Sequence, residues 1–342
     1  MKITTVGFDL AKNVFQVHGA DAHGKAVLRK QLKRKDVRAF FAQLPPCKVG
    51  MEACGSAHYW ARELQQCGHE VRLIAPQFVK PYVKANKNDA ADAAAICEAV
   101  SRPDMRFVSV KTPEAQSLLA VHRARQGLVK QRTAQANQIR GLLAEFGIVV
   151  GQGLSSLVRR LPEILEDADN GLPGQMRQLL ARLSAHLRQL ELQVVELDHE
   201  IQRWHRTDAA SQRLAAIPGV GPLTATALVA SFGNARVFHN GRQFAAALGL
   251  VPRQHSSGGK PILLGISKRG DVYLRTLLIH GARAILAQLP APTRPDPWLT
   301  RLCARRHPHI AAVALANKNA RIAWALLAHG RIFVPDYRSA AS

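Results

Sequence analysis

Four acidic residues in the first third of the chain have the side chains and the spacing of a divalent-metal site. Asp9 sits inside an apolar, strand-like run, and Glu52 closes a second run of the same kind. Asp89 and Asp92 stand three residues apart where a helix is expected, so they share one helix face. Carboxylate oxygens suit Mg²⁺, and two such ions can stabilise the attacking and leaving oxygens of a phosphodiester. The pattern predicts a site for Mg²⁺, or Mn²⁺, that acts on a nucleic-acid backbone.

Each acid also has a purely structural explanation. Asp89 could cap the helix, Asp92 could stabilise its first turn, and Glu52 could be a surface residue at a strand end. Asp9 is harder to explain in this way, because a carboxylate inside an apolar strand is partly buried and costly without a partner. Taken together, the four acids favour metal binding.

A serine in a basic segment far downstream is the second candidate. Ser257 precedes Gly258, and its hydroxyl could attack phosphorus while nearby cations neutralise the developing charge. On its residues alone, the segment is better explained as a flexible phosphate-binding turn, and Ser256 offers a second hydroxyl. The candidate cations are Arg253, Lys260, Lys268 and Arg269.

A third motif, in residues 214–225, resembles a helix-hairpin-helix, which clamps the DNA backbone without reading its sequence. An apolar helix, a tight turn with Gly219 and Gly221, and a second helix follow one another. Glycines let a backbone approach a phosphate, and the free N–H groups at a helix start attract its charge. The alternative is a hairpin that serves packing only.

The composition favours a nucleic-acid partner. The 342 residues include 47 Lys and Arg against 24 Asp and Glu, which gives a net charge of +23. Adhesion to an anionic membrane surface is the alternative explanation of this charge. With 47% apolar residues, no membrane-length apolar stretch, no signal segment and no Cys-x-x-Cys pair, we expect a soluble cytoplasmic protein with reduced cysteines.

The first half of the chain is predicted to form an α/β scaffold for the acids. Three strands followed by alternating helices and strands indicate a mixed sheet flanked by helices, with Asp9 and Glu52 above the same sheet. The predicted strands are 3–10, 14–19, 25–32, a strand ending at Glu52, and 71–75, and the predicted helices are 36–44, 57–66 and 89–100.

The remaining chain is predicted to be mostly helical. Residues 113–146 form a long helix with a basic face, and 147–173 have the glycines and prolines of a linker. From 176 to 204, apolar residues recur at alternating steps of four and three, which predicts a coiled coil with a helix partner in an oligomer or an intramolecular hairpin. One amphipathic helix on its own domain is the alternative. The predicted domains are 1–146, 147–206 and 207–342.

Five runs, taken in order, carry a resemblance to a known family over nearly the whole chain. They are Val6-Gly7-Phe8-Asp9-Leu10-Ala11-Lys12, Met51-Glu52-Ala53-Cys54-Gly55, Asn86-Lys87-Asn88-Asp89-Ala90-Ala91-Asp92-Ala93, Ile217-Pro218-Gly219-Val220-Gly221, and Gly249-Leu250-Val251-Pro252-Arg253 with Ser257-Gly258. The chain resembles transposases of the insertion sequence 110 family, in the 1111-like branch, and is similar to Piv-type DNA invertases.

The resemblance implies an RNase H-like, RuvC-like domain that binds Mg²⁺ through Asp9, Glu52, Asp89 and Asp92. It also implies that Ser257 attacks DNA and forms a transient phosphoserine link. Members of the family assemble through the coiled coil and pair the acidic domain of one subunit with the serine domain of another. A bridge RNA selects donor and target DNA. We therefore expect a homo-oligomer, a dimer or tetramer, with DNA and RNA partners.

The resulting hypothesis is a recombinase of an insertion element, which cuts and rejoins DNA by serine transesterification. Two other functions remain open. One is a RuvC-like, metal-dependent junction nuclease that hydrolyses DNA with water alone. The other is a non-enzymatic DNA-binding protein that uses the hairpin and the basic helices, with the acids serving as helix caps.

Overall fold

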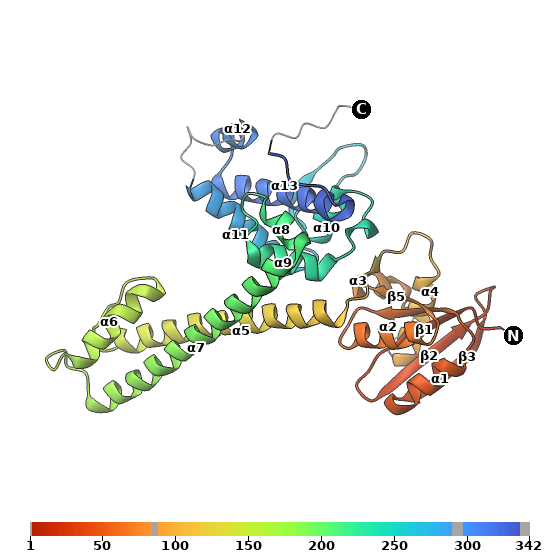
Figure 1. Ribbon diagram of the computed structural model, residues 1–342, viewed down its shortest axis with the longest axis horizontal. Coiled ribbons are helices and arrows are strands. Elements are labelled where there is room, and N and C mark those ends of the chain that lie inside the picture. Colours follow the sequence, from red (N-terminus) through yellow and green to blue (C-terminus); the bar gives the residue numbers. More distant parts are fainter. Residues whose placement is uncertain (1, 84–87, 289–296, 336–342) are drawn as a thin grey trace. The chain divides into compact units, whose positions relative to one another are not determined.

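The computed structural model describes residues 2–83, 88–288 and 297–335 of the chain (Figure 1). They fall into two compact units, each with its own core. Unit 1 comprises Met1–Pro113 with Phe232–Val237, and unit 2 comprises Glu114–Ser231 with Phe238–Ser342. Among the described residues, no helix is both long and apolar enough to cross a membrane. All five cysteines lie in the described part and are free thiols.

Unit 1 contains a mixed six-stranded sheet in the order β3-β2-β1-β4-β5-β6. The first three strands pair antiparallel, β1 pairs parallel with β4 and β4 with β5, and β6 is an antiparallel edge. The strands are β1 (Thr5–Asp9), β2 (Val14–Ala20), β3 (Ala26–Lys33), β4 (Lys48–Glu52), β5 (Glu70–Ile74) and β6 (Phe107–Val108).

The two faces of this sheet are covered differently. Large side chains such as Phe8 and Met51 pack against α1 (Val37–Gln43) and α2 (Ala57–Gln66) on one face, in a core that includes Trp60. Phe8 and Phe15 stack with ring centroids 5.4 Å apart. This aromatic and aliphatic core covers one face of the sheet.

Glycines on the opposite face bring one helix directly onto the backbone of the sheet. A Cβ at Gly7 would stand 2.0 Å from the carbonyl oxygen of Ala93, and one at Gly50 would stand 2.7 Å from Cβ of Val100. Both contacts are with α4 (Asp89–Val100), so only glycine permits this approach. A short α3 (Pro76–Val79) and the 3-10 turns η1 (Arg34–Asp36) and η2 (Lys80–Tyr82) complete unit 1.

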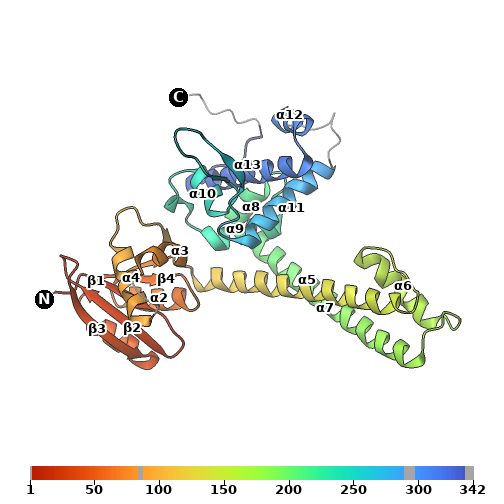
Figure 2. The ribbon, with the colours of Figure 1, turned by 180° about the vertical axis from the view of Figure 1, so that it is seen from behind.

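Unit 2 begins with two long helices that cross one another (Figure 2). They are α5 (Pro113–Ala144) and α7 (Gly174–Thr207), and their polar edges are joined by ion pairs. Arg132 lies 2.5 Å from Glu191, and Arg125 forms a bidentate pair with Asp198. Two arginines of the basic helix face therefore serve contacts within the chain.

The segment predicted as a linker contains a helix, α6 (Leu154–Glu166). Its leucines at 157 and 161 are buried, together with Ile139 of α5 and Leu180 and Leu187 of α7. The prediction of irregular structure was wrong. The glycines on both sides of this segment indicated a linker, although the residues between them have the spacing of an amphipathic helix. The seam residues of α7 are thus covered within the chain, in an intramolecular hairpin, and a coiled coil with a second copy stays a prediction.

The rest of unit 2 is mostly helical, as expected. Helix α13 (Pro308–His329) lies at its centre and packs on α10 (Gly241–Ala247) and α11 (Val272–Gln288). A two-stranded hairpin interrupts the helices where the sequence indicated a loop. The remaining elements are α8 (Ala209–Ala215), α9 (Pro222–Phe232), η3 (Ala235–Val237), β7 (Pro252–Gln254), β8 (Leu263–Ile266) and α12 (Pro297–Arg305).

Candidate functional site

Three aspartates of unit 1 lie together at the end of β1. One carboxylate oxygen from each of Asp9, Asp89 and Asp92 lies within 4.8 Å of the other two. Side chains alternate along a strand, so Asp9 lies on the same face as Gly7, the face that α4 covers. The close approach of α4 to that face then brings the first turn of the helix to the carboxylate of Asp9.

The helix start explains why Asp89 is available. Asn88, not Asp89, caps α4, because its side chain accepts a hydrogen bond of 2.8 Å from the N–H of Ala91. The capping explanation of Asp89 is therefore wrong, and Asp89 is an exposed member of the cluster. Asp92, one turn further on, is half-buried.

Glu52 lies close to this cluster but outside the 4.8 Å group. In the parallel pairing of β1 with β4, Gly7 is opposite Gly50, so Asp9 and Glu52 occupy corresponding strand ends. The charge of Glu52 is near enough to contribute to the raised pKa of Asp9. Three of the four predicted acids are thus gathered in one group, and the fourth stands at the neighbouring strand end.

The electrostatics of the cluster favour a bound cation. Burial, and then the charges of Asp92, Glu52 and Asp89, raise the pKa of Asp9 from 3.8 to about 6. Ligands at about 2.1 Å from an octahedral Mg²⁺ stand about 3 Å apart when adjacent and about 4.2 Å apart when opposite, so the three oxygens, which lie within 4.8 Å of one another, would draw together around one ion. An all-oxygen donor set of like charges therefore fits Mg²⁺ or Mn²⁺.

The predicted nucleophile of unit 2 lies at the tip of the β7–β8 hairpin. Ser257 and Lys260 form the closing bridge, and the N–H of Lys260 donates to the carbonyl of Ser257 at 3.1 Å. Gly258 and Gly259 between them have φ angles of +57° and +75°. Two consecutive positive φ angles define a type I′ turn, which only residues such as glycine adopt readily.

The two neighbouring serines have different surroundings. The Oγ of Ser256 accepts hydrogen bonds from the Gln254 side chain at 2.9 Å and from the N–H of Ile262 at 3.2 Å. Within the described part of the chain, the hydroxyl of Ser257 has no such partner, and the residue is exposed. Both serines are exposed, so the two hydroxyls differ in their hydrogen bonds and not in their access to solvent.

The predicted cations surround the base and tip of this hairpin. Arg253 on β7 and Lys260 at the turn are exposed, as are Lys268 and Arg269 after β8. A buried arginine fixes the last two, because Arg275 donates to the carbonyl oxygens of Leu248 at 3.1 Å and Arg269 at 3.0 Å. The side chains at 268 and 269 are therefore held at the surface by a rigid backbone.

The glycines of the expected helix-hairpin-helix have separate roles. Gly219, with φ of +84°, lies against α11, where an added Cβ would stand 2.9 Å from the carbonyl oxygen of Gly281. The close approach that Gly219 permits is thus to another helix. Gly221 is exposed and has open space around it. Contact of this turn with DNA stays a prediction.

An acidic centre on a mixed α/β sheet, in a chain that also has a helical unit with a basic hairpin, is the arrangement expected of a metal-dependent enzyme that acts on nucleic acids. Two family models match the chain: a transposase model of the DEDD type found in IS110 elements over residues 6–148, and the model of the transposase IS116/IS110/IS902 family over residues 211–295. Together with the relatives below, these matches show that the chain belongs to the IS116/IS110/IS902 family of insertion-element transposases.

Relatives match over nearly their whole length. A probable family 20 transposase of Pseudomonas aeruginosa is 55% identical over 98% of this chain and all of its own. The transposase of insertion element IS1111A from Coxiella burnetii is 47% identical, with 95% of this chain and 90% of its own covered. That of IS1328 from Yersinia enterocolitica is 44% identical, with 97% and 98% covered. DNA is thus the substrate, and the DEDD domain indicates metal-dependent cleavage.

Proposed function

We propose that this transposase cuts and rejoins DNA strands by transesterification at Ser257, with Asp9, Glu52, Asp89 and Asp92 holding divalent ions. The observation that carries the proposal is the state of the two serine hydroxyls. That of Ser256 accepts two hydrogen bonds, whereas that of Ser257, at the hairpin tip beside Lys260, has no such partner within the described part of the chain.

The chemistry balances without an external energy source. A bond forms between the Ser257 oxygen and phosphorus while the bond from phosphorus to one deoxyribose oxygen breaks. The serine loses its proton and the released deoxyribose oxygen gains one. The phosphodiester energy stays in the phosphoserine link, so a second deoxyribose hydroxyl can reverse the reaction and rejoin a strand.

The cations of the hairpin stabilise the charge that develops on the phosphate. Arg253 and Lys260 lie on the hairpin itself. Lys268 and Arg269 follow the hairpin, and Arg275 donates a hydrogen bond to the carbonyl of Arg269. A divalent ion bound by the acids supplies further positive charge at the phosphate oxygens. The acids position that charge, and their mutual repulsion is relieved when it is present.

Partners follow from the charge and from the family resemblance. A net charge of +23 suits donor and target DNA as well as a structured bridge RNA. We further propose that the protein works as a homo-oligomer, dimer or tetramer, in which the acids of one copy and Ser257 of another act on one phosphate.

A covalent adduct tests the nucleophile. The full-length protein is incubated with Mg²⁺ and a nicked or mismatched duplex that carries the element ends, and adducts are resolved by denaturing electrophoresis. Ser256→Ala is the matched control, since it removes the neighbouring hydroxyl. We expect adducts with the wild type and with Ser256→Ala and none with Ser257→Ala. Undiminished adducts with Ser257→Ala would exclude this serine.

The nuclease alternative gives a different outcome in the same assay. Hydrolysis by water leaves free 5′-phosphate ends and no adduct, whichever serine is changed. A mixture of two inactive variants tests whether the site is shared between copies. Protein with Asp9→Asn is mixed with protein that carries Ser257→Ala. The mixture can cleave DNA only if one copy supplies the acids and another supplies the serine. Inactivity of the mixture, with each partner folded, would contradict the shared site.

A further inference from the structure

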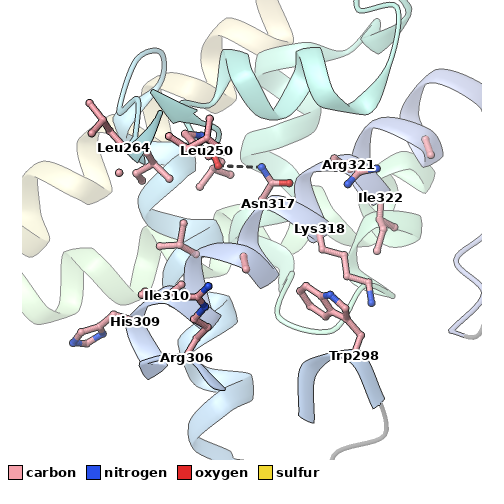
Figure 3. Close-up of a pocket in the computed structure, with 17 residues that line it drawn as sticks. Leu250, Leu264, Trp298, Arg306, His309, Ile310, Asn317, Lys318, Arg321 and Ile322 are labelled. Atoms are coloured by element: carbon pink, nitrogen blue, oxygen red, sulfur yellow. Dashed lines mark hydrogen bonds between the residues drawn. The ribbon is translucent and has the colours of Figure 1, made fainter. Parts of the chain in front are cut away.

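A large apolar hollow adjoins the hairpin that carries Ser257 (Figure 3). It has a volume of about 1320 Å³ and lies between β8 and α13, with Trp298 of α12 at one end. Pockets for small molecules usually measure about 300–1,000 Å³, so this hollow is large enough for a segment of a polymer. We call it the apolar groove. The residues on which the argument depends are Leu263, Leu264, Trp298, Arg306, Ile310 and Arg321.

The walls of the apolar groove expose apolar side chains to solvent, although proteins usually bury side chains of this kind. Leu263 on the hairpin is 65% exposed, and Ile310 on the facing helix is 53% exposed. Contiguous exposed apolar side chains mark a binding surface. The side-chain amide of Asn317, at the base of the apolar groove, already has a hydrogen-bond partner, because it donates to the carbonyl of Leu250 at 3.0 Å.

The charges of the apolar groove all have one sign. None of its 17 lining residues is acidic, whereas Arg306, Lys318 and Arg321 line it together with His309. The ammonium of Lys318 lies 4.6 Å from the ring centroid of Trp298. Apolar and aromatic surface combined with cations is the composition that binds single-stranded nucleic acid, where bases contact the apolar groups and phosphates meet the cations.

We infer that the apolar groove binds an unpaired segment of DNA, with bases against its walls and phosphates toward Arg306 and Arg321. The inference deepens the proposed function and rests on it, since one wall is the hairpin of the proposed nucleophile and cutting one strand at a time exposes unpaired bases. DNA is favoured over RNA because the apolar walls offer a 2′-hydroxyl few hydrogen-bond partners.

The test measures binding without chemistry. The full-length protein in the Ser257→Ala background, with EDTA, is titrated into a fluorescein-labelled twelve-nucleotide oligothymidylate. Ile310→Asp places an acid in the apolar groove, and Leu263→Asp does so from the opposite wall. Ile332→Asp is the matched control, because that isoleucine is 77% exposed, is not among the lining residues and gives the same change of charge. We expect about tenfold weaker binding for the two groove variants and less than twofold for the control, the order of one lost base contact.

Three other results would overturn the inference. If all three variants bind the oligothymidylate equally well, the apolar groove does not bind DNA. If the groove variants change only the sedimentation of the protein, the occupant of the apolar groove is a second copy of the chain. If they weaken only the binding of an oligouridylate of equal length, the occupant is RNA. Because the assay contains no metal ion and no serine nucleophile, its outcome is separate from that of the adduct experiment.

Discussion

Removal of the Asp9 charge should stabilise the metal-free protein while abolishing its response to Mg²⁺. The pKa of Asp9 is raised from 3.8 to about 6, so the ionised carboxylate is disfavoured in the folded state at neutral pH. Each pKa unit corresponds to about 1.4 kcal/mol, which gives an upper bound of about 3 kcal/mol. Solvent near this half-buried side chain reduces the expected gain from Asp9→Asn to about 2 kcal/mol.

The pH dependence has a definite sign. A carboxyl whose pKa is higher in the folded state destabilises the fold fully above about pH 6, and the penalty disappears as the pH falls toward 3.8. The advantage of Asp9→Asn should therefore be largest at neutral pH and vanish in acid. At Mg²⁺ a hundredfold above its Kd, the wild type should gain about 2.7 kcal/mol, and the variant much less.

Hydrogen exchange measured by mass spectrometry on peptides of β1 and β4 gives the stability of unit 1 alone in the full-length protein. Asp104→Asn is the control, because Asp104 is an exposed aspartate of the same unit. Its change of net charge is identical, and it should leave both the metal-free stability and the Mg²⁺ response unaltered. Lower stability of Asp9→Asn in EDTA, or an equal Mg²⁺ response in both variants, would refute the repulsion on which the predicted site depends.

Three further predictions concern positioning. Gly7→Ala should destabilise unit 1 by about 2 kcal/mol or more and weaken Mg²⁺ binding in calorimetry, since its Cβ would meet the carbonyl of Ala93, whereas Gly55→Ala, in open space, should do neither. Burial lowers the pKa of His122 from 6.5 to about 4, so its contribution of about 3 kcal/mol is complete above pH 6.5 and is lost as the pH falls to 4; His122→Gln should flatten that part of a urea-stability profile. Arg275→Met should make the hairpin more sensitive to limited proteolysis, with little change in the melting of α5 and α7.

The scaffold of the acids could be predicted from the sequence because its signals are local. The apolar run that contains Asp9 and the one that Glu52 closes indicate strands, and the polar start of α4 indicates a helix. Parallel strands place their carboxyl ends at one edge, so the gathering of acids there followed from general rules. The separation of Glu52 from the three aspartates did not follow, because it depends on how α4 lies on the sheet.

Two kinds of feature in unit 2 were not predicted. Some depend on contacts between residues far apart in the sequence, and others have a local signal that the surrounding residues outweigh. The glycine pair at 258 and 259 is a recognised signal for a two-residue hairpin turn, yet the polar composition around it favoured a loop. The packing of Gly219 on Gly281 joins segments with no local pattern in common. The apolar groove has walls from β8, α12 and α13, so no single run of sequence contains it.

The contact of α4 with bare backbone has a consequence for how the enzyme tolerates change. Since Gly7 and Gly50 carry no side chains, the height of the helix above β1 and β4 is set by main-chain thickness alone. Substitutions among the aromatic residues below the sheet can then alter melting temperature without moving the carboxylates. Stability can thus change through mutation below the sheet while the placement of the carboxylates is preserved, whereas a side chain at Gly7 or Gly50 would change both.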